Sequence, residues 1–199
     1  MATAQLLNLA HIRTGYQFRE RAPFTPNGRY SVIQLKDSDT ARLLDDQEFQ
    51  KFDLDNVKDS DLVNQGDILL RAKGNNHYAV CVDRILTDCL AGGLSLVIQC
   101  DKQKILPEFL TWYLNQQPAQ AFLHKISAGT SIPVVSKKAL LELLVPVPPL
   151  AKQQSIGNLY LTLLKEEQLS HKLSNARQHF LNGRMLSLVK TEQSLNFAR

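Results

Sequence analysis

Hydrophobic residues follow two different patterns along this chain, and the change comes near residue 150. Before it, apolar residues form short runs bounded by Gly, Asn and Asp, which is typical of β-strands separated by turns. These runs cover residues 30–35, 68–72, 78–82, 94–99 and 143–147. Two further segments open with Pro107 and Pro118 and repeat their apolar residues every three or four positions, which predicts short helices. The pattern predicts an α+β fold, a mixed globular domain of short strands and helices.

Beyond residue 150 the pattern predicts one long helix with an apolar seam. No proline occurs between Lys152 and Leu186. Apolar residues recur at helical spacing on one side of this segment, namely Ile156, Leu159, Leu163, Leu173, Ala176 and Phe180. Asn182 and Gly183 form a stop signal near its end. A projecting helix cannot bury such a seam against its own domain, so we expect a partner to cover it. A helix folded back onto the domain is the alternative.

These patterns divide the chain into a globular domain (1–150), a helix for spacing and dimerisation (151–186) and a C-terminal tail (187–199). No internal repeat is found. No apolar run reaches transmembrane length, no signal peptide is evident, and Cys81, Cys89 and Cys100 form no C-x-x-C pair. We therefore expect a cytoplasmic protein without membrane contact, whose free thiols are small core residues rather than metal ligands.

The net charge of +4 and the pI near 9.0 suggest a polyanionic partner. The charge is unevenly distributed, because residues 37–67 carry ten acidic and three basic side chains. If the protein binds DNA, this acidic segment should face away from it or touch another protein. A solvated surface is the alternative interpretation.

Three groups of residues combine positive charge with hydrogen-bonding groups and are candidates for contacts with DNA. The richest is Arg71, Lys73, Asn75, Asn76, His77 and Tyr78; the second is Arg13, Arg19, Arg21 and Arg29; the third is Thr130, Ser131, Lys137 and Lys138. Arginine can read guanine and asparagine can read adenine, while lysine suits phosphates. Ser136 can cap a short helix whose first turn holds Lys137 and Lys138, and an external anion would offset these charges. An ordinary polar turn at residues 74–76 is the alternative.

Catalytic motifs are absent from the sequence. It lacks a G-x-x-x-x-G-K-[ST] phosphate loop, a G-x-S-x-G nucleophile elbow and H-E-x-x-H metal spacing, and its five histidines are scattered. The N-P-P-[YF] sequence of adenine methyltransferases is also missing. We expect a non-enzymatic chain with no catalytic residue, no metal and no cofactor of its own.

Four segments resemble, in order, the type I restriction-modification DNA specificity subunits. Residues 9–16 (LAHIRTGY) are similar to the family's first segment, and residues 66–71 (GDILLR) to its central strand. Residues 106–114, with Leu-Pro-Glu-Phe-Leu, are similar to its aromatic helix, and residues 148–156, with Pro-Pro-Leu and Gln-Gln, to the start of its long helix. Each motif alone is loose, but their order makes the resemblance specific, and it spans residues 7–186.

The resemblance implies a function in which chemistry belongs to partners. One recognition domain would bind one half of a bipartite site in double-stranded DNA and dock an adenine methyltransferase (modification) subunit. A restriction motor subunit would cleave unmodified DNA. Such subunits carry two recognition domains and two helices that pack as an antiparallel coiled coil, whereas 199 residues accommodate one of each. The chain is expected to be either a half-subunit that forms a homodimer through its helix, or a fragment.

Three other functions remain open from the sequence. The first is a solitary DNA-binding regulator, or a decoy that sequesters a methyltransferase. The second is an assembly protein that acts through its helix without DNA contact. The third is an enzyme of unrecognised type.

Overall fold

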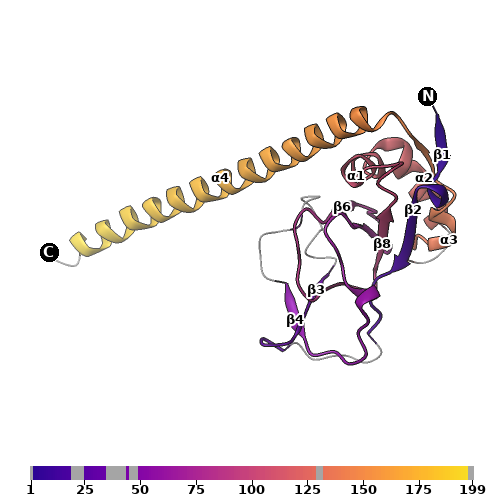
Figure 1. Ribbon diagram of the computed structural model, residues 1–199. Coiled ribbons are helices and arrows are strands. Elements are labelled where there is room, and N and C mark those ends of the chain that lie inside the picture. The colour runs from indigo at the N-terminus through magenta and orange to yellow at the C-terminus, as the bar shows by residue number, and fades with distance from the viewer. Residues whose placement is uncertain (1, 19–24, 35–43, 45–48, 129–131, 197–199) are drawn as a thin grey trace. The chain divides into compact units, whose positions relative to one another are not determined.

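The structure, a computed structural model, describes residues 2–18, 25–34, 44, 49–128 and 132–196, with side chains up to residue 188. It divides into two compact units, residues 1–162 and residues 163–199. The first unit contains the described strands and short helices, and the second contains the later part of one long helix (Figure 1). Each unit is described by itself below.

The central sheet of the first unit has four antiparallel strands. Their order is β2 (Ala10–Thr14), β8 (Ser95–Cys100), β5 (Ile68–Arg71) and β6 (Ala79–Cys81). The apolar runs at 68–72, 78–82 and 94–99 are thereby confirmed as strands. Ile68 and Leu70 enter one apolar cluster, while Leu69 between them enters another. Both faces of the sheet are buried, which is why its strands read as continuous apolar runs rather than as an alternation.

Two smaller sheets complete the strands. One has the order β4 (Gln50–Phe52), β3 (Tyr30–Ile33) and β7 (Cys89–Ala91), with β3 and β7 parallel. The other pairs β1 (Thr3–Gln5) with β9 (Leu144–Pro146). Strands β3 and β9 confirm the runs at 30–35 and 143–147. Single 3-10 turns lie at Leu6–Asn8 and Asp59–Asp61.

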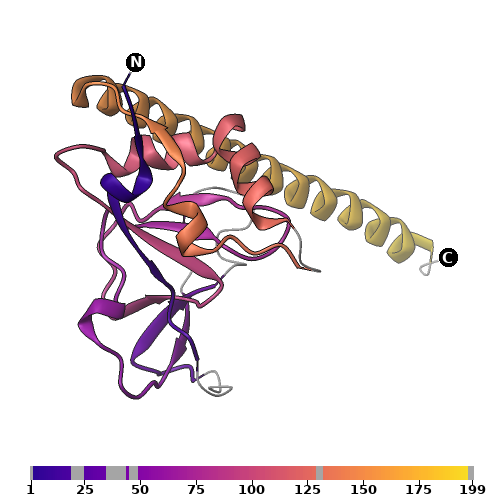
Figure 2. The same ribbon diagram turned by 90° about the vertical axis from the view of Figure 1, so that its right-hand side faces the viewer.

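Helices α1 (Pro107–Leu114) and α2 (Gln117–Ser127) confirm the helices predicted at the two prolines. They lie on one side of the central sheet, and β3 and β4 lie on the other side (Figures 1 and 2). Phe109, Leu110 and Leu123 share a cluster with Ile68 and Leu70, so the main core lies between helices and sheet. The short helix α3 (Lys137–Leu140) is capped as predicted, because Ser136 Oγ accepts a hydrogen bond from the Ala139 amide (3.2 Å).

The long helix α4 (Leu150–Asn196) begins on the first unit through residues that are not hydrophobic. The Gln153 side chain is 1% exposed; its Oε1 accepts from the Leu106 amide (2.8 Å), and its Nε2 donates to the carbonyls of Lys104 (3.0 Å) and Pro148 (2.8 Å). A Cβ on Gly157 would lie 2.8 Å from Glu108 Cβ, so only glycine allows this close approach. One helical turn further, the Tyr160 hydroxyl accepts from Asn115 Nδ2 (2.9 Å). These three residues form the docking face of α4.

The predicted helix end at Asn182 and Gly183 is wrong. The helix continues through both residues to Asn196, so the part of the 187–199 tail that the structure describes is helical. A glycine ends a helix by adopting a left-handed conformation, and within a long helix it is instead tolerated at about 1 kcal/mol relative to alanine. No atom lies within 4 Å of where a Gly183 Cβ would be, so nothing forces a turn there.

The cysteines are free thiols in or beside the core, as the sequence predicted. All three are unbridged; Cys81 and Cys89 are buried, and Cys100 is half-buried against the main core. Burial raises the pKa of the Cys81 and Cys100 thiols to about 12. Within the described residues, no helix is both long enough and apolar enough to cross a membrane.

Candidate nucleic-acid interface

The structure joins two of the three candidate groups into one surface. The first group runs from Arg71, the last residue of β5, through the loop to β6, and residues 132–138, which lead from α2 into the first turn of α3, carry the described part of the third group. The Gly74 amide donates to the Pro133 carbonyl (3.0 Å), and the Val135 amide donates to the Ala72 carbonyl (2.8 Å). Segments that lie about sixty residues apart in sequence therefore form a short antiparallel ladder. We call residues 71–78 and 132–138 together the paired loops.

The paired loops carry positive charge only. The sequence has no Asp or Glu between Asp67 and Asp83, or between Glu108 and Glu142. Lys137 and Lys138 are exposed in α3, and Lys73 is half-exposed. Asn75 and Asn76 are exposed at the tip of the first loop, where their amides can donate and accept hydrogen bonds. This arrangement suits a polyanion whose groups present both donors and acceptors.

The conformation of the first loop depends on Gly74 and Arg71. Gly74 has a φ of +108°, a conformation that L side chains rarely adopt. A Cβ at this position would also lie 3.2 Å from Arg71 Nη2. Arg71 Nε donates to the Lys73 carbonyl (3.2 Å), so the half-buried guanidinium braces the loop from within its own turn. Tyr78 at the other end of the loop is half-exposed.

His77 corrects the predicted set of DNA contacts, because its side chain is fully buried. Its Nδ1 lies 3.0 Å from the Arg71 carbonyl oxygen, and its Nε2 lies 3.1 Å from Ser127 Oγ. The His77 carbonyl in turn accepts from Gln120 Nε2 (3.0 Å). The imidazole cannot reach a ligand; it ties the two ends of the first loop to each other and to the end of α2. Sequence reasoning placed it on the surface because its neighbours in the loop are polar.

The protonation of His77 follows from these partners. A carbonyl oxygen only accepts hydrogen bonds, so Nδ1 carries a proton and donates to Arg71. Burial lowers the pKa of His77, and the nearby charges of His124 and Arg71 lower it further against an opposing contribution from the Arg71 hydrogen bond. In the neutral imidazole Nε2 is an acceptor, and the one proton of the Ser127 hydroxyl is shared between Nε2 and the His124 carbonyl, which also lies 3.1 Å from Oγ.

Arg13 and Arg29, the described members of the second candidate group, make their contacts with other parts of the first unit. Arg13 is half-buried, and its Nη2 donates to the Leu62 carbonyl (2.7 Å), while its Nε is buried without a partner. Burial lowers the pKa of Arg13, opposed by Asp67 and Asp61. This guanidinium ties β2 to the segment before Val63. Arg29 is exposed and lies over the Tyr30 ring (5.0 Å), 3.8 Å from a carboxylate oxygen of Asp88.

Four predicted residues lie outside the described residues: Arg19, Arg21, Thr130 and Ser131. Sequence reasoning missed Ser127 and Gln120, which fix the first loop, and the exposed Ile132 and Val134 of the second. The sequence around Ser127 gives no signal for this role, because its neighbours Ile126 and Ala128 are apolar. Ile132 and Val134 were not among the predicted site residues, although both side chains are exposed.

The predicted dimerisation seam lies away from the docking face of α4. Leu159 is 72% exposed although it neighbours the buried Tyr160, because the helix turns its side chain to another direction. Further along, Leu163, Leu173 and Phe180 are 50%, 52% and 68% exposed, and Ala176 is exposed. Ile156 differs, because it packs partly against the main core.

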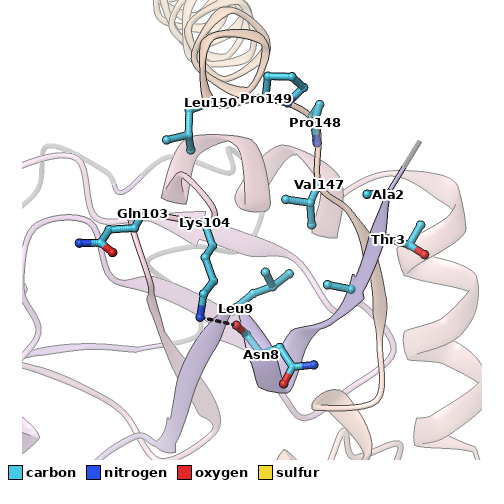
Figure 3. A pocket seen from close by; sticks show the side chains of 11 residues that line it. Ala2, Thr3, Asn8, Leu9, Gln103, Lys104, Val147, Pro148, Pro149 and Leu150 are labelled. Atoms are coloured by element: carbon cyan, nitrogen blue, oxygen red, sulfur yellow. Dashed lines mark hydrogen bonds between the residues drawn. The ribbon is translucent and has the colours of Figure 1, made fainter.

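A mostly apolar groove of about 490 Å³ lies where α4 begins (Figure 3). Strand β1, the turn after β8 and residues 147–150 line it. Lys104 stands at its margin, where Nζ donates to the Asn8 carbonyl (3.3 Å) and lies 2.9 Å from a carboxylate oxygen of Asp101. Among the described residues no group of three His, Cys, Asp or Glu side chains is arranged to hold a metal ion.

Comparison with known proteins identifies the family of this chain and solved structures with a similar fold. The family model described as "Type I restriction modification DNA specificity domain" matches residues 1–178. The S subunit of a type I restriction-modification system from M. genitalium is similar in structure, with a TM-score of 0.59 and 18% identity over 85% of this chain and 40% of that one. The HsdS subunit from Thermoanaerobacter tengcongensis gives 0.57 and 17% over 85% and 38%.

A third structure comes from work described as the "structural basis underlying complex assembly" and conformational transition of the type I R-M system. It gives a TM-score of 0.61 and 16% identity over 89% of this chain and 41% of that one. A search of curated proteins finds no match. The chain spans about two fifths of the length of these solved structures, and likeness at this identity shows the fold. Because the family model covers most of the chain, the protein belongs to the type I restriction-modification DNA specificity domain family.

Proposed function

We propose that this chain is the specificity subunit of a type I restriction-modification system and that the paired loops read one half of a bipartite DNA site. The observation that carries the proposal is the ladder between residues 72–74 and 133–135, which merges two cationic segments into one surface. Lys73, Lys137 and Lys138 supply phosphate contacts that fix position, and Asn75 and Asn76 supply groups that can read base edges. The hydrogen bonds of the buried His77 hold the loop in place from inside the first unit.

The helix would bring in a second recognition domain, which reads the other half of the DNA site. Leu159, Leu163, Leu173 and Phe180 form an exposed apolar seam along the helix. A second copy of the chain, packed antiparallel along this seam, would cover it and set the distance between two recognition domains. Because a two-fold axis copies one half-site onto the other, the recognised sequence is a spaced inverted repeat.

Chemistry belongs to partner subunits. An adenine methyltransferase subunit docks on this chain, holds its own methyl donor and flips the target base, and a motor subunit cleaves unmodified DNA. The chain itself contributes binding and spacing. This assignment agrees with the absence of catalytic motifs from the sequence.

DNA binding is tested by reversing charge on the paired loops. Selection from random duplex DNA, with and without the methyltransferase encoded beside this chain, first identifies the site. We then expect Lys73→Glu with Lys137→Glu to weaken binding about 10- to 100-fold. The slope of log K against log salt should fall by roughly 2, since each phosphate contact contributes about 0.9.

Lys102→Glu is the control for the single variant Lys73→Glu, which should also weaken binding, because each of these two variants changes the net charge by the same amount. Lys102 is exposed in the turn after β8, and the β5–β8 register places that turn at the opposite end of the sheet from the paired loops. This variant should bind DNA like the parent protein. If both variants lose the same affinity for DNA, net charge alone explains the effect. If neither loses affinity, the paired loops are not the interface.

The pairing of two copies is tested by light scattering. Leu163→Ser with Leu173→Ser should convert a dimer into a monomer. His171→Ser is the control, because it lies about 135° from the centre of the seam at 100° per residue and is also exposed. A parent protein that is monomeric, or an asymmetric selected site, would refute the homodimer while leaving DNA recognition to be judged on its own.

A further inference from the structure

Val134 presents an apolar side chain on the outward face of the paired loops. It lies directly opposite Lys73 in an antiparallel bridge. The two ladder hydrogen bonds join the neighbours of this pair, Gly74 with Pro133 and Val135 with Ala72, so Lys73 and Val134 form a non-hydrogen-bonded pair whose side chains share one face. Val135 on the opposite face is 1% exposed, whereas Val134 is 45% exposed. The alternation points Val134 outward beside the Lys73 side chain.

Ile132 extends this apolar feature. It is 51% exposed and stands two residues before Val134 in the same segment. Single exposed apolar residues are ordinary on protein surfaces. These two are unusual in their setting, because lysines flank them on both segments of the paired loops and the sequence supplies no carboxylate there. An apolar protein partner would not be favoured by such a cationic rim, whereas DNA is.

We infer that Val134, together with Ile132, reads the 5-methyl group of thymine in the major groove. This inference rests on the proposed function. Thymine is the base that presents an apolar group in that groove, and an aliphatic side chain is the contact that recognises it. Lys73 on the same face would contact a phosphate, and this contact would fix how far the Val134 side chain enters the groove. Because valine is branched at Cβ, few rotamers are lost when it is held against a base.

The test is a double-mutant cycle between protein and DNA. Each thymine of the selected half-site is replaced in turn by deoxyuridine, which lacks only the methyl group. At one position this should weaken binding of the parent protein about fourfold, the effect of burying one methyl-sized group. With Val134→Ala the parent duplex should bind about as weakly, and deoxyuridine at that position should have a smaller further effect than in the parent protein, because only Ile132 then contacts the methyl group. Ile85→Ala, at an 82% exposed isoleucine outside the paired loops, should keep the full deoxyuridine effect.

The outcomes separate this inference from the proposed function. If selection enriches no sequence, the proposed function fails. If a site is enriched but contains no thymine, or if deoxyuridine weakens Val134→Ala as much as the parent protein, only the methyl-reading role is overturned. Loss of methyltransferase association in Val134→Ala with unchanged DNA binding would also overturn it and would assign this surface to a protein contact. Both variants alter exposed side chains, so circular dichroism should show parental folding.

Discussion

Replacement of Gln153 by methionine should destabilise the first unit by removing the buried hydrogen bonds on the docking face of α4. The amide makes three hydrogen bonds, to the Leu106 amide and to the carbonyls of Lys104 and Pro148, and its side chain is 1% exposed. Methionine has nearly the same length and volume but offers none of these bonds. It would leave one donor and two acceptors in a site that excludes water.

The expected loss of stability follows from the number of backbone groups left without a hydrogen bond. Each neutral hydrogen bond contributes about 1 kcal/mol net, and each buried group left unsatisfied costs roughly 1–3 kcal/mol. Relaxation and the better hydrophobicity of methionine offset part of this. We therefore expect a loss of about 3 kcal/mol in the free energy of unfolding, a large share of the roughly 5–15 kcal/mol that a domain has.

The assay is urea unfolding followed by the fluorescence of Trp112. This single tryptophan lies in α1, 5.5 Å from the Phe109 ring at the main core, so it reports on the unit to which Gln153 is bound. With an m-value of roughly 2 kcal/mol/M the midpoint should fall by about 1.5 M, with the slope unchanged.

Gln154→Met provides the control at the next residue. Gln154 is exposed, and its Nε2 donates to Asn158 Oδ1 (2.9 Å) on the helix surface. The control should change stability by less than about 0.5 kcal/mol. If Gln153→Met costs less than about 1 kcal/mol, or no more than Gln154→Met, then the buried amide does not fix α4 to the first unit and the reasoning is refuted.

Three further predictions follow from the described contacts. The lowered pKa of His77 favours its neutral form, so stability should be full above the unfolded pKa of about 6.5 and decline as pH falls through the folded pKa; urea midpoints should fall from pH 7 to pH 5, less steeply in His77→Asn. Ser136→Ala removes the cap of α3 and should lower the free energy of unfolding by about 1 kcal/mol in the same assay, whereas an unchanged value would deny the cap a role. Thiol pKa values of about 12 for Cys81 and Cys100 predict slow alkylation at pH 8 in native protein and rapid alkylation in urea, followed by mass spectrometry.

The sequence predicted strands best where both faces of a strand are buried. The apolar runs at β5 and β8 were recognised because each of their apolar residues enters one of two apolar clusters. Strands β1, β2 and β4 were missed because their residues alternate between contact and solvent over only three to five positions. Strand β7 was also missed, although its three residues are all buried. Their pairing is set by distant partners, which a local pattern does not contain.

The sequence identified candidate site residues by their side-chain chemistry, but it did not predict which way each side chain points. Arg13, Arg71 and His77 were all chosen as polar groups in loops. The structure turns Arg13 toward Leu62, braces the loop with Arg71 and buries His77 against Ser127. Val134 was not predicted as a site residue, yet the structure exposes its side chain beside the buried Val135. Side-chain direction in these loops depends on the ladder between residues 72–74 and 133–135, a contact that neither segment encodes alone.

The paired loops divide support from recognition in a way that bears on how a binding site can change. His77, Ser127 and Gln120 form their hydrogen bonds inside the first unit, so replacing them strands buried partners and destabilises the fold. Asn75, Asn76 and Val134 are outward, and substitutions at such positions usually alter stability by less than about 0.5 kcal/mol. The surface can therefore acquire a different set of contacts while the ladder and the buried imidazole keep the backbone in place. A recognition module needs this separation, because a new DNA sequence can be read without a new fold.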